Sequence, residues 1–376
     1  MIGTILNVML TRGLTMRRWN NFPRIENVSH LDNVGFVMHI ALFLTFLEEK
    51  EGYKVNKEFL LKRILFSSLN RLVLSDINSG TKEYIMSMNK DIFAQLEEKA
   101  IEKIFELDAP EYIKEDIQNT IDNTEFKQEI LIIEAAKKFA SQRECIINAR
   151  VFSEVYDKTL HIINGELDVL REKVPSLDIL MDNESYITYL SHIRGLSHSM
   201  RWNQHQRRFP VSVMSHLVYV TFINYIIAQF ERKAGNEIHM ENILLRSVYH
   251  DIPEAITGDI ITPTKRAIPE FVDVLEQAER NMMDDYLFDY LPDSYKSEVE
   301  ELIFAPFDGE IGKIAKYGDI FSALFEAKIE INSGNQGFLD IYQTIKKQTN
   351  TFDLTGTDYL LTHGIDAFDE EKKLVL

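Results

Sequence analysis

The chain has 376 residues, of which 45% are hydrophobic and 27% are charged, a composition typical of soluble globular proteins. This length allows two or three domains, each able to bury its own core. The formal net charge of −18 argues against broad binding to nucleic acid, because an acidic surface repels a phosphate backbone. A small anionic substrate is still allowed, since a metal ion and a few basic side chains can reverse the local field.

The cysteine content and the apolar segments predict a cytoplasmic protein. Cys145 is the only cysteine, which excludes an intrachain disulfide and a cysteine-based zinc site. At the N-terminus the apolar run precedes the basic residues, the wrong order for a secretory signal. The longest apolar runs, 34–47 and 217–230, are each about 14 residues, too short to span a bilayer. We therefore expect buried core helices there and no membrane partner.

Helical periodicity dominates the chain. Apolar residues recur at three- and four-residue spacing, and no strand or hairpin pattern is present. The chain is therefore predicted to be all-α. The clearest helical segments are 96–105, 129–139, 156–170, 211–230, 271–290 and 310–331.

Short motifs occur twice in the same order, which predicts an internal duplication. Arg-Gly-Leu, Arg-Trp-Asn and Ser-His-Leu follow one another in 12–31 and again in 194–217. Asp, Ile, Thr and Lys fall in the same register in 76–82 and 259–265, and 135–142 resembles 313–320. Chance similarity between helices is the alternative. Two tandem helical bundles are predicted, at 1–175 and 185–350, with a connection at 173–185 and a C-terminal tail at 351–376.

The second half contains a candidate set of metal ligands. His250 and Asp251 are adjacent in the sequence, His216 lies on the preceding apolar helix, and Asp319 lies on a later one. A divalent cation needs several nitrogen and oxygen ligands that converge from rigid elements, and this set can supply them. Each residue also has a structural alternative: a core histidine, a solvated helical aspartate, or a pair that ends a helix.

This pattern resembles the HD-domain phosphohydrolases, and within them the bacterial HD-domain 5′-deoxynucleotidases. The resemblance covers 194 to about 339 and depends on Met-Arg-Trp at 200–202, the helix of His216, the motif at 249–265, and Lys-Tyr-Gly-Asp-Ile at 316–320. It implies one divalent metal ion, with Mn, Co, Fe, Ni and Zn all suited to such ligands. The implied ligands are His216, His250, Asp251 and Asp319.

The resemblance also implies roles for residues around the metal. Glu254 and Asp259 would place or deprotonate the attacking water, with helix-face or capping roles as the alternative. Arg201 would contact the phosphate, Trp202 would face the sugar, and Lys265 is a weaker candidate for charge compensation. Plain core or surface positions are the alternatives for these three.

Two further features of this region affect the prediction. The family usually has a glutamate before the first histidine ligand, where this chain has Ser215, so the substrate pocket is expected to differ from the family pattern more than the metal site does. Pro253 predicts that the helix carrying the His-Asp pair is kinked or restarted there.

The function implied by the resemblance is removal of phosphate from a nucleotide, a (deoxy)nucleoside 5′-monophosphate, by a metal-bound water. One alternative is hydrolysis of a signalling nucleotide or a dNTP. Members with those activities usually carry an acidic pair or further histidines, whereas here Ala255 follows Glu254 and no histidine lies between Asp251 and Asp319. Another alternative is a non-catalytic nucleotide-binding sensor or scaffold.

The first half is predicted to have lost the metal. Aligning the shared motifs pairs His30 with His216, and places Leu69, Asn70 and Ser141 opposite the other three ligands. Leucine cannot bind a cation, and neutral asparagine and serine are poor replacements. Because family members commonly form dimers, the chain is expected either to form a homodimer or to use its first half as an intramolecular partner.

Overall fold

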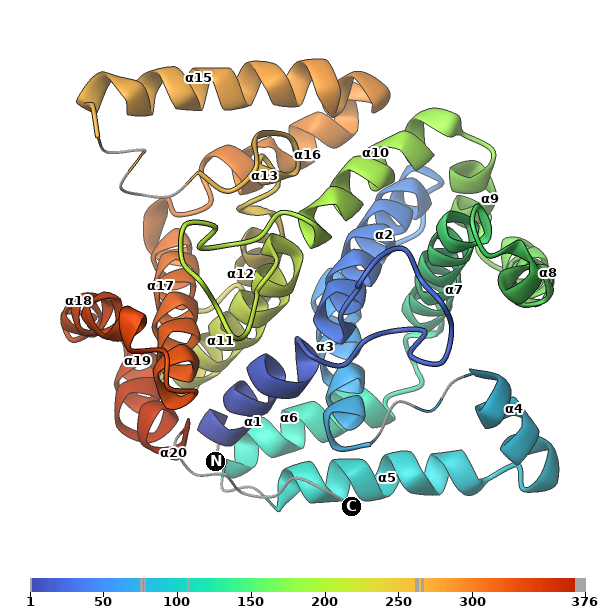
Figure 1. Cartoon of the computed structure of the whole chain (residues 1–376), viewed down its shortest axis with the longest axis horizontal. Coiled ribbons are helices and arrows are strands. Elements are labelled where there is room, and N and C mark those ends of the chain that lie inside the picture. Colours follow the sequence, from blue (N-terminus) through green and yellow to red (C-terminus); the bar gives the residue numbers. More distant parts are fainter. Residues whose placement is uncertain are drawn as a thin grey trace.

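Helices and their connections make up the whole described molecule (Figure 1). The computed structural model describes residues 2–74, 77, 79–106, 109–260, 264 and 267–368. Within these ranges no strand is present, and the only β-type pairing consists of two isolated bridges. The prediction of an all-α chain is confirmed.

The helices fall into two series in chain order. The first comprises α1 (Ile2–Val8), η1 (Met9–Gly13), α2 (His30–Lys50), α3 (Lys57–Val73), α4 (Ser79–Met88), α5 (Ile92–Phe105), α6 (Glu111–Asp122), α7 (Lys127–Ala149), α8 (Ser153–Arg171) and α9 (Pro175–Met181). The second begins with α10 (Glu184–Arg194), η2 (Gly195–Ser197), α11 (Val213–Lys233), α12 (Met240–Tyr249), α13 (Glu254–Thr257), α15 (Pro269–Tyr286) and η3 (Phe288–Tyr290). It ends with α16 (Asp293–Phe304), α17 (Gly309–Asn332), η4 (Gln336–Phe338), α18 (Leu339–Thr349), α19 (Thr355–Tyr359), η5 (Leu360–Gly364) and α20 (Ile365–Phe368).

Helices α2 and α11 pack against each other at the centre of the molecule, and corresponding helices of the two series lie on opposite sides of them (Figure 1). Both central helices are apolar nearly all round, so burial on every side stabilises them. By length and composition both could cross a membrane, but 94% of each apolar window is buried inside the protein. The prediction of two buried core helices is confirmed.

The two halves are joined where α2 and α11 begin. Ser29 and Asp32 form a capping box at the start of α2. The same Asp32 carboxylate accepts hydrogen bonds from the hydroxyls of Ser212, the N-cap residue of α11, and of Ser215 in that helix, the second at 2.8 Å. A carboxylate is favoured here because the positive ends of both helix dipoles meet at this point. Ser215, the departure from the family pattern, thus contacts the other half of the chain.

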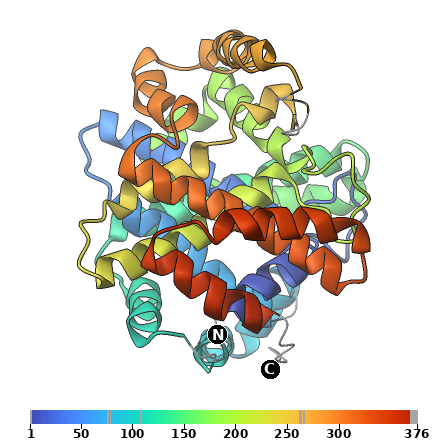
Figure 2. The ribbon, with the colours of Figure 1, turned by 90° about the vertical axis from the view of Figure 1, so that its left-hand side faces the viewer.

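The last helices return to the first half (Figure 2). Helix α20 packs against α1, and the Asn7 side-chain amide donates a hydrogen bond to the carbonyl of Phe368 at 2.8 Å. Helix α19 packs against α11, where a Cβ on Gly356 would lie 2.6 Å from the Cα of Ile227. Residues 355–368 therefore pack against the central helix α11 and against α1 of the first half.

The two halves share structural landmarks that fix their alignment. Trp19 and Trp202 both adopt a positive φ, 54° and 59°, which is uncommon for a bulky residue. The same number of residues separates each tryptophan from the N-cap residue of the central helix, Ser29 or Ser212. Each serine also forms an isolated β-bridge with an equivalent residue, Ser29 with Arg17 and Ser212 with Met200. The connecting loop therefore has one length in both halves, without an insertion.

This alignment corrects the one predicted from Ser-His-Leu. Ser29 caps its helix, whereas Ser215 lies one turn inside its own, so the shared motif is not structurally equivalent. The prediction paired the four ligands with His30, Leu69, Asn70 and Ser141. We aligned α2 with α11, α3 with α12 and α7 with α17 by their first residues. In this alignment the counterparts of His216, His250, Asp251 and Asp319 are Asn33, Ser67, Ser68 and Lys137. The first half lacks the ligand set on either alignment.

The contacts of Asp32 lead to a stability prediction. Asp32→Ala removes a helix cap and the acceptor for two buried hydroxyls, so we expect the free energy of unfolding to fall by about 2–4 kcal/mol. Urea denaturation followed by circular dichroism measures it. Asp91→Ala is the control, because Asp91 precedes α5 without a side-chain cap bond and should cost less than about 0.5 kcal/mol. Equal losses in both variants would contradict the role given to Asp32.

Candidate metal centre

Three helices of the second half bring the candidate ligands together. His216 lies in the first turns of α11, Asp319 lies on α17, and both helices pack against α12. His250 is the C-cap residue of α12, and Asp251 follows it in a turn. The chain restarts as α13 at Glu254, in agreement with the helix break predicted at Pro253. The turn directs consecutive ligands toward the same point.

The ligand atoms converge at distances that suit one cation. The ligand atoms of His216, His250 and Asp251 all lie within 4.8 Å of one another. Asp251 Oδ2 lies 3.6 Å from His216 Nε2 and 3.4 Å from His250 Nε2, and Asp319 Oδ1 lies 3.4 Å from His216 Nε2. Ligands bound about 2.1 Å from one ion stand roughly 3.0–3.5 Å apart. The four side chains are therefore close to the spacing that a divalent ion requires.

Hydrogen bonds fix the orientation of both imidazole rings. His250 Nδ1 donates to the carbonyl of Ser247 at 3.0 Å. His216 Nδ1 lies 2.9 Å from Ser322 Oγ and 3.3 Å from Glu326 Oε1. Within the described residues, both Nε2 atoms are buried and lack a hydrogen-bond partner. Such atoms are costly to bury unless something binds them, so these residues fit a metal ion.

The charges around the site favour cation binding. Burial lowers the pKa of His250, which keeps its imidazole neutral. Burial alone would raise the pKa of Asp251 and of Asp319, but nearby cationic groups, including Lys316 at 2.8 Å from Asp319, hold both below the usual value. Burial alone would lower the pKa of His216, but Asp319 and Glu326 raise it above the usual value. Metal binding would therefore release a proton from this imidazole.

Arg201 and Trp202 lie beside the ligands. Arg201 Nη1 is 3.5 Å from Asp251 Oδ2, and its Nε is 3.5 Å from Glu326 Oε1. Burial alone would lower the pKa of Arg201, but the surrounding carboxylates raise it, so the guanidinium stays charged. The indole of Trp202 donates to Glu326 Oε2 at 2.9 Å. The loop of 200–203 is thereby fixed next to the metal site.

The remaining predicted site residues lie in different surroundings. Glu254 is nearly buried at the start of α13, and its charge contributes to the raised pKa of Arg201. Asp259 Oδ2 accepts from the backbone N–H of Trp202 at 3.1 Å, so it holds the loop in its left-handed conformation. Lys265 lies outside the described residues.

The sequence did not identify Glu326, whose carboxylate contacts several residues of the site. It is fully buried and contacts His216, Arg201, Trp202 and Arg207, the last at 2.9 Å. Burial alone would raise the pKa of Glu326, but Arg201, His216 and Arg207 hold it well below the usual range. Its position seven residues after Asp319, on the same face of α17, was an available signal.

Comparisons with known proteins place the chain in a family. A family model described as 5′-deoxynucleotidase YfbR-like matches the chain twice, over residues 7–183 and 186–368. A 5′-deoxynucleotidase of Vibrio parahaemolyticus is 27% identical over 157 residues, 40% of this chain and 78% of the relative. One of Klebsiella pneumoniae is 25% identical over 182 residues, 48% of this chain and 91% of the relative.

A search of solved structures gives a similar match. An HD-domain phosphohydrolase from Listeria innocua is 26% identical, covers 49% of this chain and 89% of its own, and has a TM-score of 0.45. The two 5′-deoxynucleotidases align over most of their own length to less than half of this chain.

Removal of one imidazole tests the metal centre. We expect His250→Ala to lose bound divalent metal, because three ligands hold an ion less tightly than four. Elemental analysis of the purified chain measures metal content. A chelator should lower the melting temperature of the original protein but not of the variant. His161→Ala, at an exposed histidine of α8, is the control, and a similar metal loss in it would refute the assignment.

Glu326 provides a second test. Glu326→Gln keeps the size of the side chain but weakens its hold on His216, so metal affinity should fall by about 10–100-fold. Competition with a metal-sensitive dye measures the dissociation constant. Glu310→Gln, an exposed position in the first turn of the same helix, should leave it unchanged. Unchanged affinity in Glu326→Gln would mean that the carboxylate does not orient the ligand.

Proposed function

Because the chain belongs to the family of YfbR-like 5′-deoxynucleotidases, we propose that its second half hydrolyses the phosphate of a (deoxy)nucleoside 5′-monophosphate with one divalent metal ion. The observation that carries this proposal is the convergence of four candidate ligands, two of which are buried imidazoles whose Nε2 atoms have no hydrogen-bond partner among the described residues. We propose His216, His250, Asp251 and Asp319 as the ligands. Their donor set suits Mn, Co, Fe, Ni or Zn.

Arg201 is the proposed phosphate-binding residue. A bound divalent ion supplies Lewis-acid polarisation of a phosphoryl oxygen and lowers the pKa of a water molecule. The guanidinium of Arg201 can donate two parallel hydrogen bonds to phosphoryl oxygens, and it lies 3.5 Å from a ligand carboxylate. Its raised pKa supports a permanent positive charge at the place where negative charge accumulates during hydrolysis.

Acidic and aromatic side chains complete the proposed site. Glu254 is proposed to accept the proton of the attacking water, since its carboxylate is nearly buried and close enough to affect Arg201. Asp259 is proposed to act with it and to hold the loop through the backbone of Trp202. Trp202 would pack against the sugar, and Lys265 would add positive charge near the phosphate.

The first half is proposed to act as an intramolecular partner. The shared carboxylate of Asp32 supports this, because it caps one central helix and accepts hydrogen bonds from the other. We also propose a cytoplasmic location and no extended nucleic-acid partner, in keeping with the buried free Cys145 and the net charge of −18.

A screen for phosphate release tests the function. Metal-loaded protein is incubated with deoxynucleoside and ribonucleoside mono- and triphosphates, and free phosphate is measured. We expect release from monophosphates and a loss of about a thousandfold or more in Asp251→Ala, because the metal contribution disappears. Asp289→Ala, at an exposed aspartate of the same half, should keep full activity. Activity retained in Asp251→Ala, or triphosphate as the released product, would refute the proposal.

A further inference from the structure

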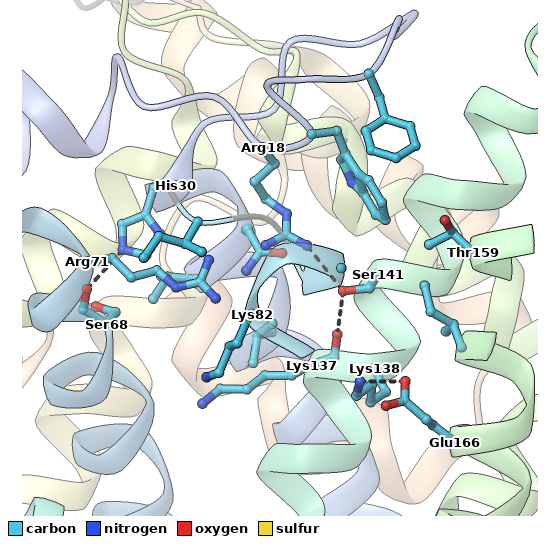
Figure 3. Close-up of a pocket in the computed structure, with 18 of the residues that line it drawn as sticks. Arg18, His30, Ser68, Arg71, Lys82, Lys137, Lys138, Ser141, Thr159 and Glu166 are labelled. Carbon is cyan, nitrogen blue, oxygen red and sulfur yellow. Dashed lines mark hydrogen bonds and ion pairs between the residues drawn. The ribbon is translucent and has the colours of Figure 1, made fainter. Parts of the chain in front are cut away.

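The first half contains a cavity where the second half has its metal centre (Figure 3). Its volume is about 450 Å³, within the range of small-molecule sites. The counterparts of all four ligands, Asn33, Ser67, Ser68 and Lys137, line it. The space at this position is thus retained, although the residues that could bind a metal ion are absent.

Cationic side chains outnumber anionic ones in the lining of this cavity. One carboxylate, Glu166, lines it together with five basic side chains: Arg18, Arg71, Lys82, Lys137 and Lys138. Arg18 pairs with Glu144 at 2.9 Å, Lys138 with Glu166 at 2.5 Å and Lys82 with Glu97 at 3.7 Å. In a chain with a net charge of −18, such a concentration of positive charge indicates an anionic ligand.

Lys137 is the central feature. It occupies the position of the ligand Asp319, so an ammonium replaces a carboxylate there. No ion pair involves Lys137 within the described ranges, and its side chain is accessible to solvent through the cavity. Surrounding protein, and then the cations Arg71 and Arg63, lower its pKa to about 8. A bound anion would relieve the repulsion between these cations.

The basic groups converge from different helices. Figure 3 shows the end groups of Arg71, on α3, Lys82, on α4, and Lys137, on α7, directed into the same space. Thr159 lines the same cavity and can donate a further hydrogen bond from its hydroxyl. A tetrahedral anion with several oxygens can use donors that approach from several sides.

The same cavity has an aromatic wall. Trp19 and Phe22 line it, with ring centroids 5.8 Å apart. The indole of Trp19 is fixed by a hydrogen bond to Glu144 at 2.6 Å, so the ring is held in place. A planar, partly apolar group can pack against such a surface next to the basic cluster.

We propose that this cavity binds the phosphate group of a nucleoside phosphate without a metal ion and without hydrolysing it. Lys137, Arg71 and Lys82 supply the positive charge that the metal ion would supply in the second half. No cleavage is expected, because the ligand positions hold asparagine, serine and lysine, and Arg71 stands where the second half has Glu254. The site is separate from the proposed catalytic centre.

Binding to the metal-free full-length chain tests this site apart from catalysis. The chain is stripped with a chelator and titrated calorimetrically with a deoxynucleoside 5′-monophosphate, inorganic phosphate or the uncharged nucleoside. We expect Lys137→Met to lose one binding event per chain, with affinity for phosphate groups reduced by about tenfold or more. Lys99→Met, at an exposed lysine of α5 paired only within its helix, should bind like the original protein.

Two more variants separate binding from folding. Lys137→Arg keeps the charge and should retain binding, and Arg71→Gln should weaken it. Circular dichroism and the melting temperature report whether each variant is folded. Equal affinity for inorganic phosphate and nucleotide would show that the phosphate group alone accounts for binding. Tighter binding of the nucleotide would show that the aromatic wall contributes. No binding of either probe, unchanged binding by folded Lys137→Met, or equal binding of the uncharged nucleoside would overturn the proposal.

Discussion

Two buried imidazole nitrogens face two carboxylates in the second half, and the surrounding structure depends on this arrangement. The Nδ1 atoms of His216 and His250 are engaged by Glu326, Ser322 and a backbone carbonyl, which leaves both Nε2 atoms directed at the carboxylates. Leaving such buried groups unsatisfied costs about 1–3 kcal/mol each. A cation bound between them would remove this cost and compensate the negative charge of Asp251 and Asp319. Metal binding at the proposed site would therefore stabilise the second half.

A second, smaller framework is common to both halves and does not need a metal. In each half a buried glutamate accepts a hydrogen bond from the indole of the Arg-Trp loop, Glu144 from Trp19 and Glu326 from Trp202. Both tryptophans adopt a strained left-handed backbone conformation at this contact. The first half has this framework and its central helix with a lysine at a ligand position, so neither requires a metal ligand there. The duplicated scaffold can thus present a metal in one half and basic side chains in the other.

The sequence predicts the fold well because apolar periodicity alone identifies the long helices and the two buried ones at the centre. It also selects four candidate ligands that the structure brings together, since few residue types bind divalent cations. The detailed alignment of the halves failed, because a three-residue motif was a weaker guide than the position of a helix cap. Glu326 was missed because a glutamate within a helix usually faces solvent, and its burial depends on contacts with Arg201 and Arg207 that a single sequence does not reveal.

The central claim is that one half binds a catalytic metal and the other half has replaced it with basic side chains. Anomalous diffraction from crystals of the manganese-loaded chain tests this most directly, because it locates each bound ion in the molecule. The account predicts one strong peak per chain, between His216, His250, Asp251 and Asp319, and none in the cavity beside Lys137. A peak in the cavity of the first half, or no peak between the four proposed ligands, would contradict it.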